Sequence, residues 1–204
     1  MPAHPIDFEL QSDVFSTPEL KALFDEQTRI RRWLRFGAAL AQTQGEMGII
    51  PPAAAEEIGR RASLEALDLE AVRREYGVSR NSLVPVLKAL RRACGETHGE
   101  YVHYGVTTQD VIDTGEVLAL KELLAIVARD LGRVRNLLLD LARRHRNTPM
   151  IGRTHSQQAL PITFGLKAAV WLAEVDRHMD RIASLRERVL IGQLGGAVGT
   201  MAAL

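Results

Sequence analysis

A short polar stretch at residues 152–161 carries the side chains best suited to chemistry. It holds Arg153, Thr154, His155 and Gln157 between a glycine and a proline, and it separates two long segments with apolar stripes. Histidine can act as an acid or a base near neutral pH, and arginine can bind a carboxylate through two parallel hydrogen bonds. The alternative is a loop histidine that bonds only to neighbouring backbone groups.

A second polar stretch, residues 102–110, precedes the first of those long segments. It places His103 ahead of Thr107 and Thr108, just before an expected helix. Hydroxyl and free amide groups at a helix N-terminus bind anions readily. The alternative is that Thr107, Thr108 or Asp110 only caps the helix. We expect the two stretches to meet in one site that binds anions and transfers protons. That site would hold no metal, because no Cys/His cluster has ligand spacing.

The elements that must position these stretches are helices. Ala, Leu, Arg and Glu dominate the composition, and no strand-like alternation of apolar and polar residues is present. We therefore expect an all-α fold in which a small N-terminal helical domain (1–110) is followed by the first long helices of a central bundle (111–204). The spacing predicts helices at 17–47, 53–62, 68–76 and 82–94, a long helix after residue 110, and another at about 163–191.

Apolar residues of the first long helix recur three and four positions apart, as in a bundle or coiled coil. They are Val117, Leu120, Leu124, Val127, Leu131, Val134, Leu138 and Leu141. The second long helix has a similar stripe. Because two helices alone would not bury both stripes, we expect the chain to be the N-terminal part of a longer protein or to oligomerise. By themselves, the stripes would equally suit a non-catalytic helical oligomerisation module.

Charge and composition indicate which partners and which cellular location to expect. The formal net charge is +1, which gives no reason to expect a nucleic-acid partner. No apolar run approaches the roughly 20 residues of a membrane span. The single Cys94 cannot form an intramolecular disulfide, and the N-terminus lacks the pattern of a signal peptide. We therefore expect a cytoplasmic protein that binds neither nucleic acid nor membrane.

Three stretches together resemble the motifs of the fumarase/aspartase superfamily. They are residues 103–114, 152–165 and 193–200, in the family's order and separated by helices of suitable length. The resemblance covers about the whole chain. Residues 82–90, 157–161 and 167–172 are most similar to the 3-carboxy-cis,cis-muconate cycloisomerases and their lyase relatives, and the adenylosuccinate lyases come next.

Three positions depart from the patterns of these branches. Asn81 stands where adenylosuccinate lyases usually have His. His155 stands where bacterial cycloisomerases often have Trp, whereas lyases that eliminate fumarate keep His. Gly37 stands where the family often has Glu. The first two departures point in opposite directions, so the substrate stays open between a carboxymuconate, adenylosuccinate and another succinyl compound.

The resemblance implies a lyase or cycloisomerase that acts on a polycarboxylate without a cofactor. A base removes a proton next to a carboxylate, and an acid helps the C–N or C–O bond at the neighbouring carbon to break. His155 would be the catalytic acid or bind the leaving side. Six residues would bind the substrate and stabilise its developing charge: His103, Thr107, Thr108, Arg153, Thr154 and Gln157.

The resemblance also implies a homotetramer with shared active sites. Members of the superfamily build each site from several subunits and pack their long helices into a central bundle. Their base is a Ser on a Gly-rich loop well past the second long helix, and these 204 residues contain no such loop. We therefore expect the chain to carry two of the three site regions, which are the stretches with His103 and His155, and to lack the third, which is the Ser loop. We expect it to be inactive alone.

Overall fold

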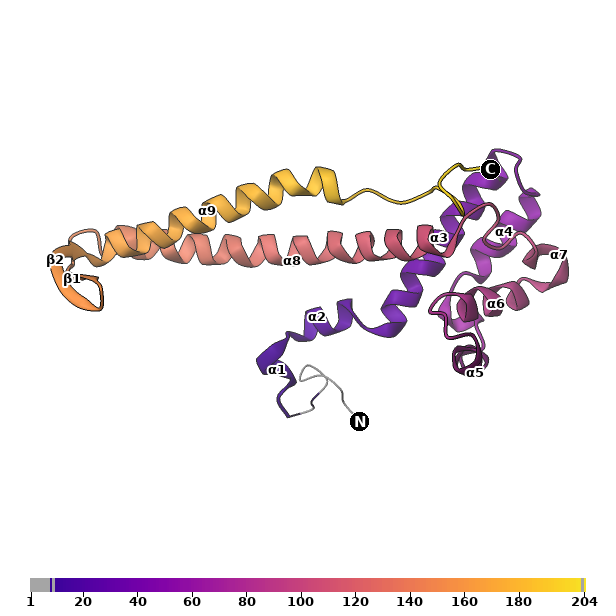
Figure 1. Ribbon diagram of the computed structural model, residues 1–204, viewed down its shortest axis with the longest axis horizontal. Coiled ribbons are helices and arrows are strands. Elements are labelled where there is room, and N and C mark those ends of the chain that lie inside the picture. Colours follow the sequence, from indigo (N-terminus) through magenta and orange to yellow (C-terminus); the bar gives the residue numbers. More distant parts are fainter. Residues whose placement is uncertain (1–7, 9, 203) are drawn as a thin grey trace. The chain divides into compact units, whose positions relative to one another are not determined.

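The computed structural model of the chain describes residues 8, 10–202 and 204. The described part is helical apart from one antiparallel pair of strands, which confirms the all-α prediction and adds a small hairpin to it (Figure 1). The elements in chain order are α1 Ser12–Phe15, α2 Pro18–Leu23, α3 Glu26–Glu46, α4 Pro52–Arg61, the 3-10 turn η2 Leu64–Ala66, α5 Leu69–Ser79, α6 Val84–Ala93, α7 Gly95–Gly99, α8 Thr108–Arg144, β1 Pro149–Thr154, β2 Gln157–Thr163 and α9 Phe164–Val189.

The chain divides into two compact units. The first comprises residues 1–120 and 191–204, and the second comprises residues 121–190. Helix α8 therefore begins in the first unit and contributes most of its length to the second. Within the described residues, no helix is both long and apolar enough to cross a bilayer.

The short helices of the first unit bury one apolar core. Helix α3 contributes Trp33 and Leu34, and it approaches α4 so closely that a Cβ atom at Gly45 would lie 2.6 Å from the Cβ of Ala55. Val102, which begins the polar stretch of residues 102–110, and Val111, which follows it, are both buried in the same core. Burial of an apolar residue at each end thus fixes the loop that enters α8.

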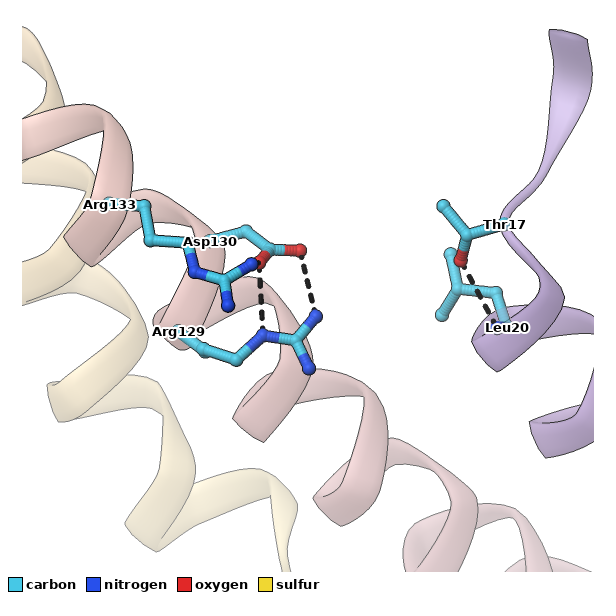
Figure 2. Close-up of polar contacts among 5 residues, drawn as sticks. All are labelled: Thr17, Leu20, Arg129, Asp130 and Arg133. Carbon is cyan, nitrogen blue, oxygen red and sulfur yellow. Dashed lines mark hydrogen bonds and ion pairs between the residues drawn. The ribbon is translucent and has the colours of Figure 1, made fainter. Parts of the chain in front are cut away.

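The helix predicted at residues 17–47 is in fact two helices. Thr17 caps α2, as expected, by accepting a hydrogen bond from the backbone N–H of Leu20 (Figure 2). Asp25 then caps α3, because its carboxylate accepts hydrogen bonds from the N–H groups of Gln27 at 2.9 Å and Thr28 at 3.3 Å. Asp side chains compete with the helical backbone for such donors, so Asp25 ends one helix and begins another.

Asp25 offers a test of this helix boundary. Replacing Asp25 by Ala should lower the free energy of unfolding by about 0.5–2 kcal/mol, because two N–H groups lose their acceptor. Asp25→Asn keeps an acceptor in place and should stay near the wild type. Urea unfolding followed by circular dichroism measures both. Equal losses in the two variants would show that the charge, and not the cap, is what stabilises α3.

The second unit pairs the later part of α8 with α9. Gly165 lies against the end of α8, where a Cβ atom would come within 2.6 Å of the carbonyl oxygen of Ala142. Further along, the Arg135 guanidinium donates to the Asp176 carboxylate at 2.6 Å. The apolar stripes are half-buried or buried except at Val134 and Leu185, which stay exposed.

The hairpin between the long helices contradicts the expectation that the chain has no strand (Figure 1). Strands β1 and β2 pair antiparallel around a two-residue turn, His155-Ser156, whose φ angles are 47° and 59°. Positive φ at both central residues is typical of a type I′ turn. The backbone twist of this turn matches the right-handed twist of the two strands that it connects. The strands were missed because their residues near the turn are all polar and exposed, so apolar and polar residues do not alternate.

Candidate active site

The loop between α7 and α8 holds the first group of predicted site residues. The side-chain amide of Gln44, on α3, donates to the carbonyl oxygen of Tyr104 at 2.9 Å. Arg91 donates to the carbonyl oxygen of Val102 at 3.3 Å. His103 adopts a φ of 67°, which is uncommon for a residue other than glycine. Neighbouring helices thus hold the loop in a conformation that a free segment would rarely adopt.

The His103 side chain is partly buried beside the core. Burial lowers the pKa of His103, the Arg91 guanidinium lowers it further, and Asp110 acts in the opposite direction. His103 is therefore a neutral imidazole at neutral pH, with one ring nitrogen to donate and one to accept. A small cavity of about 10 Å³ is lined by both His103 and Gly37. A Cβ atom at Gly37 would meet nothing within 4 Å, so the missing side chain leaves open space.

Asp110, which the sequence suggested only as a possible helix cap, has further contacts in the structure. It is 5% exposed, and its carboxylate accepts three backbone hydrogen bonds at 3.0 Å each. The donors are the N–H groups of Thr107, Gly195 and Gly196. Burial raises the pKa of Asp110, but these hydrogen bonds outweigh it and hold the pKa below its ordinary value. Asp110 is therefore a carboxylate at neutral pH.

These contacts bear on the two interpretations of residues 102–110. Asp110, at the third position of α8, accepts from Thr107, as the acidic residue of a capping box does. The capping prediction is thus confirmed for Asp110. The Thr107 N–H is bonded to the Asp110 carboxylate and is therefore not available to an anion. The hydroxyls of Thr107 and Thr108 stay candidate substrate contacts.

A second contact brings the third motif to the same place. The Thr114 hydroxyl accepts from the Gln193 N–H at 2.9 Å and donates to the Gln193 carbonyl oxygen at 3.3 Å. Together with Asp110, it ties the segment after α9 to the first turns of α8. The structure therefore joins the first and third motifs, 79 to 86 residues apart in sequence, within the first unit.

The second motif forms the end of the hairpin in the second unit. Its residues from Arg153 to Leu160 are all exposed. Thr154 pairs with Gln157 across the strands, and Arg153 pairs with Gln158. Opposed residues share a face and neighbours alternate, so Arg153 lies on the other face from Thr154 and Gln157. The predicted residues are thus divided: His103, Thr107 and Thr108 in the first unit, and Arg153, Thr154, His155 and Gln157 in the second.

Among the described residues, no three or more His, Cys, Asp or Glu side chains are grouped as a metal site would require. The donors that the motifs supply are hydroxyl, amide, imidazole and guanidinium groups. Such groups suit the recognition of carboxylates and the transfer of protons.

Cys94 is buried in the core and is not a nucleophile of this site. Burial, and to a lesser degree the Glu57 carboxylate, raise the pKa of the Cys94 thiol to about 11. Because the thiolate is the reactive form, alkylation by iodoacetamide at pH 8 should be much slower in the folded chain than in denaturant. Mass spectrometry over time measures both rates, and equal rates would contradict the burial of Cys94.

The chain is similar to several lyases. A family model described as lyase matches residues 16–204. The N-acetyl-S-(2-succino)cysteine lyase of Dickeya dadantii is 48% identical over 202 residues, which are 99% of this chain and 44% of the relative. The adenylosuccinate lyase of Methanocaldococcus jannaschii is 39% identical over 204 residues, 100% of this chain and 43% of the relative. The crystal structure of the β-carboxy-cis,cis-muconate cycloisomerase of Acinetobacter calcoaceticus matches with a TM-score of 0.90 at 36% identity, covering 96% of this chain and 46% of that one.

The chain spans less than half the length of each of these relatives. The matched residues include all three motifs. Two succino-compound lyases and a cycloisomerase are all similar to the chain, so the cycloisomerase branch, which the sequence resemblance placed first, is not singled out.

Proposed function

Because the chain belongs to the fumarate lyase superfamily, we propose that the whole protein, of which these residues form the N-terminal part, releases fumarate from a succino-substituted compound. The observation that carries the proposal is the 48% identity, over 99% of the chain, to a lyase named for a 2-succino thioether. The similarity to an adenylosuccinate lyase supports the same substrate class, because both names describe a succinate joined to a heteroatom.

The proposed reaction is a β-elimination. A base removes a proton from the carbon next to one carboxylate of the succino group, and the electron pair forms the new C=C bond. The bond from the neighbouring carbon to sulfur or nitrogen breaks, and the leaving heteroatom takes a proton. The products are fumarate and a thiol or an amine. Carbanion character develops next to a carboxylate, so cationic and hydrogen-bonding groups around that carboxylate lower the barrier.

The motif residues supply the groups that this reaction needs. His155, exposed at the hairpin turn, is the proposed acid that protonates the leaving atom. Arg153, Thr154 and Gln157 are proposed to bind substrate carboxylates from the hairpin. His103, Thr107 and Thr108 are proposed to do so from the loop before α8. The base is proposed to be a Ser outside these 204 residues, and no cofactor is required.

We propose that the whole protein is a homotetramer with shared sites. Large apolar side chains stay exposed on the long helices, as expected of surfaces that bind other subunits: Val134, Leu137, Leu166, Val170, Trp171 and Leu185. The exposed polar hairpin would then complete a site on another subunit. In this assembly, the long helices α8 and α9 belong to the central bundle that we expected for residues 111–204, although residues 191–204 group with the first unit in the structure. A cytoplasmic location fits the free Cys94.

A second candidate is the lactonising cycloisomerisation of 3-carboxy-cis,cis-muconate. It is supported by the TM-score of 0.90 to a cycloisomerase and by the resemblance of residues 157–161 and 167–172 to that branch. A third, of another class, is a helical oligomerisation module without activity. The exposed apolar side chains of the long helices would serve it equally well.

A substrate panel separates the three. The whole protein would be given N-acetyl-S-(2-succino)cysteine, adenylosuccinate and 3-carboxy-cis,cis-muconate, and kcat/KM would be measured for each. The proposal predicts the highest value for one of the two succino compounds. Turnover of the muconate alone would favour the cycloisomerase, and a stable oligomer that turns over none would favour the non-catalytic module.

A further inference from the structure

Most of the hydrogen-bonding capacity of the Asp110 carboxylate is taken up by backbone donors of the chain itself. A carboxylate has about four lone-pair positions for hydrogen bonds. Three N–H groups at 3.0 Å occupy Asp110, one on Oδ1 and two on Oδ2. The residue is only 5% exposed. The hydrogen bonds of this carboxylate therefore serve to hold other parts of the chain.

Those parts are two motifs that are remote in sequence. Thr107 belongs to the loop that carries His103, whereas Gly195 and Gly196 follow α9. The two backbones approach closely, since a Cβ atom at Gly196 would lie 3.3 Å from the carbonyl oxygen of Gly105. Gly196 also has a φ of 71°, which disfavours other residues. The glycines thus allow the contact, and Asp110 supplies its hydrogen bonds.

Thr114, about one turn beyond Asp110 on α8, makes a separate connection to the same segment. Its hydroxyl exchanges two hydrogen bonds with the backbone of Gln193 and takes no part in capping α8. The segment is therefore fastened at two places, by a buried carboxylate and by a hydroxyl. Capping of α8 requires only the hydrogen bond from the Thr107 N–H to Asp110. It does not explain the hydrogen bonds that Asp110 and Thr114 make to residues 193–196.

We propose that Asp110, assisted by Thr114, is a positioning residue of the active site, which fastens residues 193–196 against the loop that carries His103 and Thr107. The inference rests on the proposed lyase function. The fastened segment contacts the loop at Gly105 and, through Asp110, at Thr107. His103 and Thr107 then keep one arrangement towards the substrate, without any contact between Asp110 and the substrate.

Two variants separate this role from a purely structural one. Asp110→Asn turns one acceptor into an N–H₂ donor that faces backbone N–H groups, and so breaks the fastening and weakens the cap. Thr114→Val keeps the shape of the side chain and leaves the cap intact, but removes both bonds to Gln193. Thr114→Ser restores the hydroxyl. Asp130→Asn, also on α8, is the matched control, since Asp130 is exposed and pairs only with Arg129 and Arg133 among its described contacts (Figure 2).

The experiment combines kinetics of the whole protein, on the succino compound that the wild type turns over, with amide hydrogen exchange of residues 191–201. Misplacement of reacting groups by about 1 Å can cost about 10²-fold in rate. We expect Asp110→Asn and Thr114→Val to lower kcat by up to about that factor, with less change in KM, and to speed exchange of the segment. Thr114→Ser should recover kcat, and Asp130→Asn should match the wild type.

Three results would overturn the inference. Faster exchange of the segment with unchanged kcat would show that its position does not matter to catalysis. A loss of kcat in Asp110→Asn with unchanged exchange would mean that Asp110 acts on the substrate directly. Unchanged exchange in both variants would show that neither residue holds the segment. A wild type that turns over no succino compound would refute the proposed function instead, and exchange alone would then decide whether the fastening exists.

Discussion

Replacing His155 by Ala should lower kcat of the whole protein by about 10²–10⁴-fold, the usual contribution of a positioned general acid or base. His155 is exposed in the hairpin turn, so its removal leaves no cavity in the core. The loss should therefore fall on catalysis and leave thermal unfolding nearly unchanged. Steady-state kinetics with a succino compound, beside a thermal melt of each protein, measures the two effects.

Two further variants make the His155 result specific. Asn tolerates positive φ better than most residues, so His155→Asn keeps the turn while it removes the imidazole. It should lose as much activity as His155→Ala if the imidazole is the acid, and little if only the turn matters. His178→Ala, an exposed histidine of α9 that lies 3.7 Å from Glu174, should match the wild type. Full activity in His155→Ala would refute its catalytic role.

Replacing Arg153 by Ala should lower kcat/KM by about 10–100-fold, because a hydrogen bond to a charged group is worth about 1.5–3 kcal/mol. Arg153 is exposed on the hairpin beside the turn, on the opposite face from Thr154 and Gln157. Its loss should raise KM if the substrate carboxylate is held equally before and during reaction, and lower kcat if it is held more tightly in the transition state.

Arg153→Lys and Arg188→Ala complete this series. Lys keeps the charge but cannot form the paired hydrogen bonds of a guanidinium, so Arg153→Lys should fall between Ala and the wild type. Arg188 lies in the last turn of α9, is exposed, and controls for the loss of one positive charge. An equal loss of kcat/KM in Arg188→Ala would mean that overall charge, and not the hairpin position, explains the effect.

The helical fold was predictable because apolar spacing reports directly which face of a helix is buried. The break at Asp25 was missed because that spacing continues across it, from Phe24 to Ile30. Only the capping preference of Asp distinguishes one helix from two at that point. The hairpin was missed for the converse reason: its residues near the turn are polar and exposed, and what defines it is the left-handed conformation of His155 and Ser156.

Only those residues of the candidate site that belong to a local sequence motif could be predicted. The motifs name His103, Arg153 and His155, because each stands among donors that are near in sequence. The role of Asp110 lies beyond such patterns, since two of its three partners are 85 and 86 residues away. A buried carboxylate finds its donors through the tertiary fold, and its cap to Thr107 was the only bond visible from spacing.

The most direct test of the proposed lyase is the product balance of a single reaction. The whole protein would be incubated with N-acetyl-S-(2-succino)cysteine or adenylosuccinate, and fumarate would be measured by proton NMR beside the released thiol or amine. We expect fumarate and the leaving compound to appear in equal amounts as the substrate disappears. A substrate left intact, or consumed without fumarate, would contradict β-elimination as the reaction of this protein.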